Sequence, residues 1–171
     1  PHHFSGVATV VTKLFGIVCP QVALFGQKDF QQSALVQQLV KDLNLGVEIV
    51  VCPTVRETDG LAMSSRNVYL SQEDRKRAVT LYKSLRAGAE VIRRGVTDGK
   101  AVQSAMAYVL KKEPAMTIDY LALCNPSTLE PLCDVTSRVV LLGAVRLGSV
   151  RLIDNLLVIL PWGLPNRARR L

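Results

Sequence analysis

Aromatic residues are scarce in this chain: Phe, Trp and Tyr make up 5% of its 171 residues. Charged residues are also few, at 20%, whereas 49% of the residues are hydrophobic, a balance that argues against intrinsic disorder. A core with few rings must be built from Leu, Val, Ile and Ala, which suits helices packed on a buried sheet. The composition therefore predicts a folded protein with one sizeable core or two small ones.

Motifs of several enzyme classes are missing. The chain has no Ser–His–Asp order, no Gly-x-x-x-x-Gly-Lys phosphate loop and no metal-ligand cluster. Its four cysteines form no Cys-x-x-Cys pair, and three of them lie in apolar runs; they are Cys19, Cys52, Cys124 and Cys133. We expect reduced, mostly buried thiols in a cytoplasmic protein, without a disulfide or zinc framework.

No uninterrupted apolar run reaches the length of a membrane span. The strongly apolar stretch 139–162 contains Arg146, Arg151 and Asp154, so it falls short of the roughly 20 residues that a span needs. The sequence also shows no secretory signal. We therefore expect no membrane partner.

The net charge of +7 is compatible with nucleic-acid binding, because Lys and Arg neutralise phosphates. The basic residues, however, are spread along helical stretches such as 75–77 and 93–94, with a late cluster over 167–170. No aromatic residues interleave with them as stacking platforms. This distribution favours a solvated face and a site for an anionic small molecule, with a nucleic-acid-binding domain as an alternative.

The first third of the chain alternates between helical and strand patterns. Apolar residues recur at helical spacing, and a short apolar run typical of a buried parallel strand follows each helix. The expected elements are a helix over 7–18, a strand over 22–25, a helix over 30–43 and a strand over 47–51. A strand–helix–strand crossover predicts a parallel α/β sheet.

The pattern changes in the polar segment 57–67, where we place a domain boundary. Ser71 and Asp74 have the spacing of a capping box, and the apolar stripe after them predicts a long helix that Gly95 ends. Further expected elements are a helix over 98–112 and strands over 118–123, 138–145 and 150–153. This part predicts a small α+β unit with two helices and three strands.

The segment 25–32 is the first candidate site, because it joins the end of a strand to the start of a helix. Free backbone N–H groups and the helix dipole favour an anion there, and Lys28 adds a charge that can reach a phosphate. A structural interpretation is equally open. Asp29 and Gln32 have the spacing of a helix N-cap and its reciprocal partner, and Gly26 suits a tight turn.

Two other segments carry polar groups that suit a ligand. Ser64-Ser65-Arg66 offers hydroxyl and guanidinium donors for a polyphosphate or carboxylate, although an ordinary polar linker with Asn67 as a turn residue has the same composition. The pair His2-His3 is more typical of a tag remnant or a frayed end than of a ligand site.

In combination and order, four segments resemble successive signatures of the pantothenate synthetase (pantoate–β-alanine ligase) family. They are Pro1-His2-His3-Phe4-Ser5-Gly6-Val7, the segment 25–32, the segment 55–67 and Arg151-Leu152-Ile153-Asp154-Asn155. The resemblance covers roughly residues 1–160 and implies the C-terminal part of such an enzyme. It implies an α/β fold: the C-terminal half of a Rossmann-like, nucleotidylyltransferase-type parallel-sheet domain over 1–67, then a small α+β lid domain over 68–160. The tail 161–171 has no family counterpart, and we expect it to be disordered.

The resemblance implies ATP-dependent condensation of pantoate with β-alanine through pantoyl adenylate, with ATP and Mg²⁺ as cofactors. The partners would be these small molecules and, at full length, a second copy in a homodimer. The protein would contribute by aligning the reactants and by stabilising the charge that develops in the transition state.

The same resemblance assigns residues to roles. The phosphates would be held by Lys28, Ser64, Ser65 and Arg66, of which Lys28, Ser64 and Arg66 are the expected catalytic residues. The nucleotide pocket would also be lined by Gly26, Asp29, Val55 and Met63. Gln32 and His3 would bind substrate, and no residue is expected to hold a protein-bound metal.

The sequence departs from the family pattern in several places. Gln27 stands where the family usually has Glu, and His2 stands where Gly is usual. The family's N-terminal portion, with a Gly-rich loop whose histidines engage ATP, is absent from this sequence. We therefore expect a truncated, poorly active chain with uncovered apolar surfaces that promote association. An inactive relative serving as a binding or assembly module is a further alternative.

Overall fold

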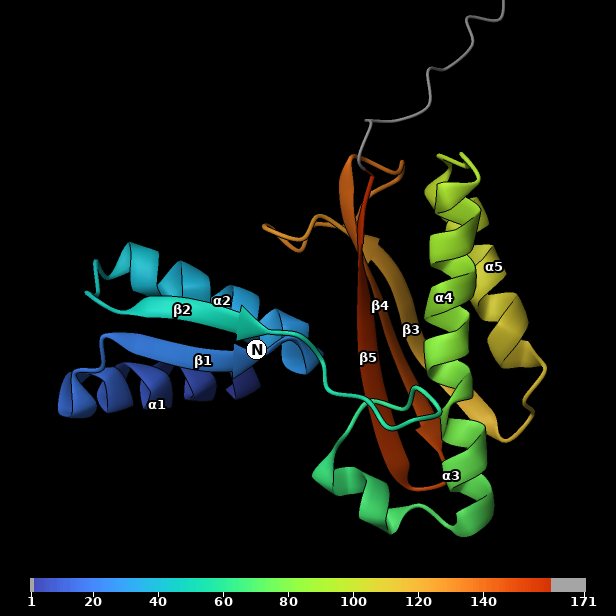
Figure 1. The fold of residues 1–171 in the computed structure, drawn as a ribbon, viewed down its shortest axis with the longest axis horizontal. Coiled ribbons are helices and arrows are strands. Elements are labelled where there is room, and N and C mark those ends of the chain that lie inside the picture. Colours follow the sequence, from blue (N-terminus) through green and yellow to red (C-terminus); the bar gives the residue numbers. More distant parts are fainter. Residues whose placement is uncertain (1, 161–171) are drawn as a thin grey trace, which may run out of the picture. The chain divides into compact units, whose positions relative to one another are not determined.

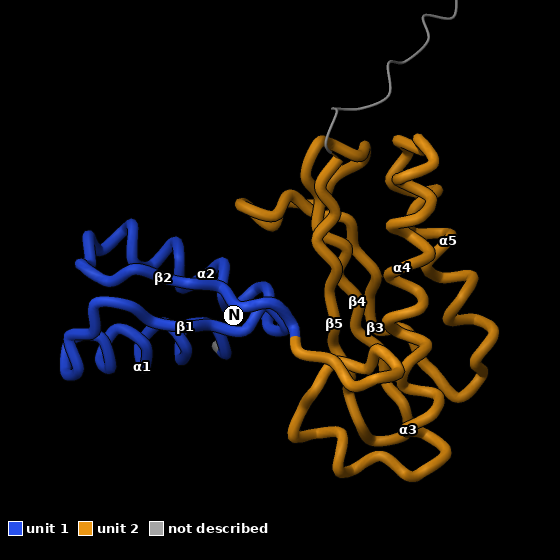
Figure 2. Tube along the Cα trace, viewed as in Figure 1, with its two compact units in different colours: residues 1–54 blue, residues 55–171 orange. Residues whose placement is uncertain are grey.

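The structure is a computed structural model that describes residues 2–160, apart from the His2 side chain. It separates into two compact units, which divide between Thr54 and Val55 (Figure 2). The division comes earlier than the boundary at 67 that the sequence suggested, because the segment after Val55 is bound to a strand of the second unit. The tail expected over 161–171 lies outside the described residues.

Unit 1 contains the predicted strand–helix–strand crossover. Its elements are α1 (His2–Val18), β1 (Val22–Gly26), a 3₁₀ turn η1 (Gln27–Asp29), α2 (Phe30–Asp42) and β2 (Glu48–Cys52). Strands β1 and β2 pair in parallel, with Val22 opposite Glu48 (Figure 1). Helix α1 begins earlier than the expected residue 7, so His3 lies in its first turn.

One face of the two-stranded sheet in unit 1 is bare. Strand side chains alternate between faces, and Phe25 on one face meets Phe15 of α1 edge to face at 6.5 Å between ring centroids. On the other face Leu24 is 69% exposed, and on α1 Ile17 is 76% exposed. These side chains confirm the expectation of uncovered apolar surface in this part of the chain.

Unit 2 is the predicted α+β unit. Its elements are α3 (Gln72–Ala78), α4 (Thr80–Arg93), α5 (Gly99–Lys111), β3 (Met116–Cys124), β4 (Arg138–Leu147) and β5 (Val150–Ile159). The strands form an antiparallel sheet in the order β3-β4-β5, and α4 and α5 lie on one of its faces (Figure 1). The single long helix expected before Gly95 is divided at Val79 into α3 and α4.

The core of unit 2 lies between this sheet and the helix pair. Leu85 and Ile92 of α4, Met106 of α5 and Leu141 of β4 are all within 1% of complete burial. The buried Ser84 hydroxyl donates to the Met106 carbonyl oxygen at 2.9 Å, which joins the two helices. Strand β5 runs to Ile159, well past the expected residue 153, because the polar pair Asp154-Asn155 is buried within it.

The cysteines are free thiols, as expected, but they are less buried than the sequence suggested. Cys124, at the end of β3, is buried and Cys52 is half-buried. Cys19 and Cys133 are exposed, so the expectation of mostly buried thiols was wrong for these two. Cys19 follows the last turn of α1 with a φ of 48°, and Cys133 lies in the connection before β4, outside either core. Within residues 2–160, no helix has both the length and the apolar character to cross a membrane.

Candidate functional site

The segment 55–63 forms a tight antiparallel turn at the start of unit 2. The Met63 amide donates to the Val55 carbonyl oxygen at 3.0 Å, and the Glu57 amide donates to the Leu61 carbonyl oxygen at 2.8 Å. Gly60 closes the turn with a φ of 97°, a conformation that L side chains rarely adopt. Val55 and Met63 therefore stand next to each other at the open end of the turn, and both are exposed.

The chain then enters a 3₁₀ helix, η2 (Ser65–Tyr69). Its N-cap is Ser64, whose hydroxyl oxygen accepts from the Arg66 amide at 3.2 Å. The Asn67 side-chain amide donates to the Ala62 carbonyl oxygen at 3.1 Å, which holds η2 against the turn that precedes it. The Ser65 and Arg66 side chains are left exposed to solvent.

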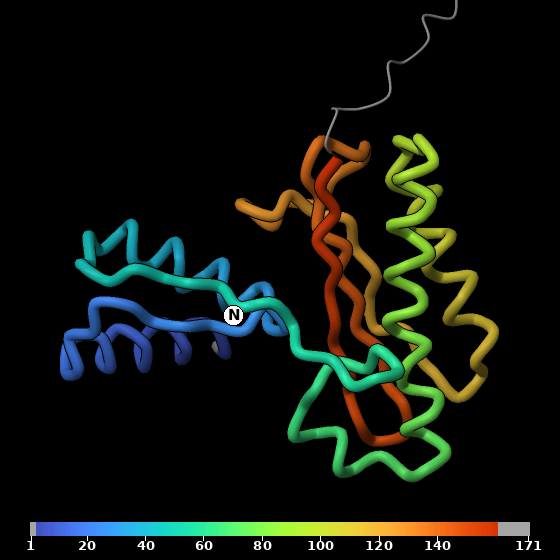
Figure 3. Tube along the Cα trace, in the orientation of Figure 1, coloured from blue at the N-terminus to red at the C-terminus, as the bar shows by residue number. Residues whose placement is uncertain are grey.

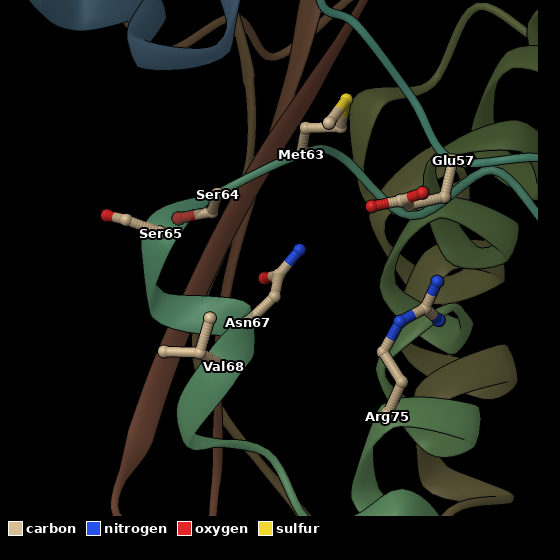
Figure 4. Close-up of a pocket in the computed structure, with 7 residues that line it drawn as sticks. All are labelled: Glu57, Met63, Ser64, Ser65, Asn67, Val68 and Arg75. Carbon is tan, nitrogen blue, oxygen red and sulfur yellow. The ribbon is translucent and has the colours of Figure 1, made fainter.

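A surface pocket of about 580 Å³ opens beside η2 (Figure 4). In Figure 4, Ser64, Ser65, Asn67 and Val68 come from one wall, while Glu57 and Arg75 stand opposite. The lining residues are Glu57, Met63, Ser64, Ser65, Asn67, Val68 and Arg75. The pocket therefore contains three of the residues expected to bind nucleotide, Met63, Ser64 and Ser65, whereas its lining does not include Val55 or Arg66.

Arg75 is a cationic residue of the pocket that the sequence analysis did not single out. Its guanidinium donates to both oxygens of Asp59, at 2.7 and 3.2 Å. These hydrogen bonds hold the pKa of Asp59 below its ordinary value and raise the pKa of Arg75. Arg75 appeared in the sequence only as one basic residue of a helix, and no spacing rule joins it to Asp59.

Asn67 is a second residue of the pocket that the sequence did not indicate as a candidate ligand contact. With its amide nitrogen bonded to Ala62, its Oδ1 atom is buried and finds no hydrogen-bond partner among the described residues. Buried acceptors in folded proteins are rarely left unpaired, so this oxygen is suited to a donor from a ligand or from water. From its sequence context, Asn67 was expected to be only a turn residue.

The remaining expected residues lie in unit 1, at the junction of β1 with α2. Gly26 ends the strand, Lys28 and Asp29 lie in η1, and Gln32 lies in the first turn of α2. Asp29 occupies the N-cap position but makes no side-chain capping hydrogen bond. The structural explanation of the Asp29–Gln32 spacing is therefore not realised, and the strand end with its helix N-terminus stands as an anion-suited junction.

His3 lies in the first turn of α1 and is exposed, with its ring 5.4 Å from that of Phe4. The helix begins at His2, so His3 belongs to a regular element. Among the described residues, no group of three His, Cys, Asp or Glu side chains is placed to hold a metal ion.

Comparisons with known proteins give one consistent result. The family model described as pantoate-beta-alanine ligase matches residues 1–157. Pantothenate synthetase from Acetivibrio thermocellus is 53% identical over 158 residues, which cover 92% of this chain and 56% of that protein. The corresponding protein from Caldicellulosiruptor bescii is 54% identical with the same coverage. The chain thus spans little more than half the length of these relatives.

Solved structures agree with the sequence relatives. The crystal structure of pantothenate synthetase from Thermus thermophilus superposes with a TM-score of 0.88 at 49% identity, covering 91% of this chain and 56% of that one. A pantoate-beta-alanine ligase from Francisella tularensis, complexed with beta-gamma ATP and beta-alanine, gives a TM-score of 0.62 at 34% identity. This match covers 92% of the present chain and 51% of the Francisella chain.

Proposed function

The chain belongs to the pantoate–β-alanine ligase family, and from that premise we propose that it takes part in the ATP-dependent condensation of pantoate with β-alanine. The observation that carries the proposal is the pocket beside η2, whose lining includes the hydroxyl-bearing Ser64 and Ser65 on one wall and the cationic Arg75 on the opposite one. Hydroxyl donors and a guanidinium are the groups that bind phosphate. The complex of the Francisella relative with an ATP compound and β-alanine supports the same ligand classes.

The proposed reaction has two steps. A carboxylate oxygen of pantoate attacks the α-phosphorus of ATP, and the bond from that phosphorus to the β-phosphate oxygen breaks, which gives pantoyl adenylate and pyrophosphate. The amine of β-alanine then attacks the acyl carbon, AMP leaves, and the amine loses a proton. No bond to the protein is needed, so the residues contribute by aligning the reactants and offsetting charge.

The residues of unit 1 have distinct proposed roles. Lys28 places a positive charge at the phosphates, and its partly buried position at the junction of β1 and α2 suits a fixed point charge. Gln32, one turn into α2, is the proposed hydrogen-bond partner of the pantoate hydroxyl and carboxylate. Gly26 and Asp29 line the nucleotide site, and His3 is the proposed substrate contact on α1.

The residues of unit 2 supply the other phosphate contacts in this proposal. Ser64 and Ser65 donate from the pocket wall, and Arg66, exposed beside them, offsets the charge of the transition state. Val55 and Met63, adjacent at the open end of the turn, present apolar surface to the nucleotide.

Mg²⁺ is compatible with this set of residues. Of the described residues that line the pocket, Glu57 is the one carboxylate, and Mg²⁺ usually binds through one or two carboxylates together with substrate phosphates. Its contribution would be to neutralise phosphate charge at the substrate, in keeping with the expectation that no residue holds a protein-bound metal. A homodimer at full length and a cytoplasmic location also stay predictions.

Pantoate-dependent exchange of pyrophosphate into ATP tests the proposal. We expect weak exchange by this chain, a loss of about tenfold or more in Lys28→Ala, and no change in Lys41→Ala, which removes an exposed lysine of α2. Exchange that needs no pantoate, or that survives Lys28→Ala unchanged, would contradict it.

A binding or assembly module is the second candidate function, and the exposed apolar residues of α1 and β1 favour it. A folded chain that binds no ATP and catalyses no exchange, but associates through these surfaces, would support this candidate instead.

A further inference from the structure

Two residues of the signature segments have no role in the proposed reaction, and the structure joins them. One is Arg56, at the start of the turn 55–63, and the other is Asp154 in β5. The guanidinium of Arg56 donates to both carboxylate oxygens of Asp154, with Nη1–Oδ2 at 2.6 Å and Nη2–Oδ1 at 3.0 Å. Figure 3 shows the segment after residue 54 passing the red strand β5, from which Asp154 comes.

The ion pair is buried and has further partners. The Asp154 side chain is 4% exposed and the Arg56 side chain 17%. Arg56 also donates to the carbonyl oxygens of Gly60, at 3.1 Å, and of Asn155, at 3.2 Å. Its guanidinium lies 3.8 Å from the centroid of the Tyr82 ring of α4, within the range of a cation–π contact. The guanidinium of Arg56 thus contacts the turn 55–63, strand β5 and helix α4 at the same time.

These contacts continue directly to the pocket. Arg56 is paired with Ala62 across the turn, and the Ala62 carbonyl oxygen accepts from the Asn67 side chain. One residue further along the turn, the Met63 amide is bonded to Val55. A path of hydrogen bonds and paired backbone therefore leads from β5, through Arg56, to the backbone that presents Met63, Ser64 and Ser65.

We propose that the Arg56–Asp154 pair is a positioning device, which fixes the segment 61–67 in the geometry that receives the nucleotide phosphates. Arg56 is in this sense a positioning residue, since it acts through the backbone of the segment. The nucleotide part of the inference rests on the proposed function, whereas the fixing of the segment does not.

Burial alone does not explain the arrangement. Removing two charges from water is costly, and an apolar pair of similar volume often stabilises a fold as well or better. An apolar pair, however, cannot hold two carbonyl oxygens and a carboxylate in one plane, which a guanidinium does with directed donors. The contribution specific to Arg56 is the orientation of the turn.

Hydrogen exchange provides a test that needs no ligand. In Arg56→Lys, which keeps the charge but loses the planar fork, we expect amide exchange of Met63 and Asn67 to accelerate by about tenfold or more. The amides of α5 and β4 should keep their protection. The matched control is Asp119→Asn, which removes another carboxylate of the same sheet, the one paired with Arg146 and Arg151. This variant should leave amide exchange unchanged at Met63 and Asn67 and also in α5 and β4. Unchanged exchange at Met63 and Asn67, or an equal loss of protection throughout unit 2, would overturn the inference.

ATP binding gives a second readout, and it separates this inference from the proposed function. If the unaltered chain binds ATP, Arg56→Lys should raise the Kd for ATP by about tenfold, with Asp154→Asn acting alike and the double variant adding little. Equal ATP affinity in a folded Arg56→Lys chain would refute positioning while the proposed function stands. If the unaltered chain binds no ATP, the proposed function fails for this chain. The comparison of amide hydrogen exchange between Arg56→Lys and Asp119→Asn still decides whether Arg56 fixes the segment 61–67.

Discussion

At the scale of single residues, the site depends on close contacts that sequence patterns do not encode. The segment 57–67 was recognisable as polar and irregular, and Lys28 and Ser64 stood out because their surroundings suit phosphate. Nothing in the sequence indicated that the ring of Tyr82 would lie against both Gly60 and Arg56. Such partners are distant in sequence, so only the fold brings them together.

Gly60 gives the prediction that belongs to this scale. A Cβ atom there would lie 2.6 Å from Cδ1 of Tyr82, and the φ of 97° is already unfavourable for alanine. We expect Gly60→Ala to lower the free energy of unfolding of unit 2 by about 2 kcal/mol, measured from the loss of α4 amide signals in urea.

Gly16 serves as the matched control, because it lies within α1 and a Cβ there meets nothing within 4 Å. We expect Gly16→Ala to be neutral or to stabilise α1 by about 0.5 kcal/mol. A Gly60→Ala chain as stable as the unaltered one would show that Tyr82 moves aside at little cost.

At the scale of elements, two segments with the same capping pattern behave differently. Ser71 caps α3: its hydroxyl oxygen accepts from the Asp74 amide at 3.0 Å, and the hydroxyl donates to the Asp74 carboxylate at 2.9 Å. Asp29 stands at the start of α2 without a side-chain capping bond. The spacing predicted the first cap and left the second as one of two interpretations, and the structure shows only the first.

This difference predicts unequal costs of substitution. Ser71→Ala should lower the stability of unit 2 by about 1 kcal/mol, because an N-terminal amide of α3 loses its partner. Asp29→Ala should change the stability of unit 1 by less than about 0.5 kcal/mol. Urea titrations of the two variants, followed by amide signals in each unit, compare them; an equal cost at both positions would mean that Asp29 caps its helix in solution.

The elements themselves were largely predictable from periodicity, and the errors have identifiable causes. The expected strand at 150–153 was too short because the polar pair Asp154-Asn155 interrupts the apolar pattern, whereas in the fold Arg56 satisfies the buried carboxylate. The long helix was predicted without its division at Val79, since apolar spacing continues across the break. The spacing of apolar residues indicates which face of an element is buried. It does not indicate where a residue distant in sequence, such as Arg56, pairs with a buried charge.

At the scale of the whole chain, the two units are unequally buried. Among the described side chains of unit 1, those that are buried are Ser33, Val36 and Val47, whereas unit 2 contains an extensive core between the sheet and α4 with α5. Burial of apolar surface supplies most of the stability of a fold. Unit 1 should therefore be the weaker part of this chain.

Native-state hydrogen exchange measures that inequality. We expect amides of β1 and α2 to exchange about a hundredfold faster than those of β4 and α5, a difference of about 3 kcal/mol in opening free energy. Equal protection in both units would instead show that they unfold as one cooperative body.

The four free thiols have a consequence for the handling of this chain. Cys19 and Cys133 are exposed, one in each unit, whereas Cys124 is enclosed and burial raises the pKa of its thiol. In air, the two exposed sulfurs are the ones available for intermolecular disulfides, and such oxidised dimers would imitate association through the apolar surfaces of unit 1. Sedimentation with and without a reductant distinguishes the covalent species from the non-covalent one.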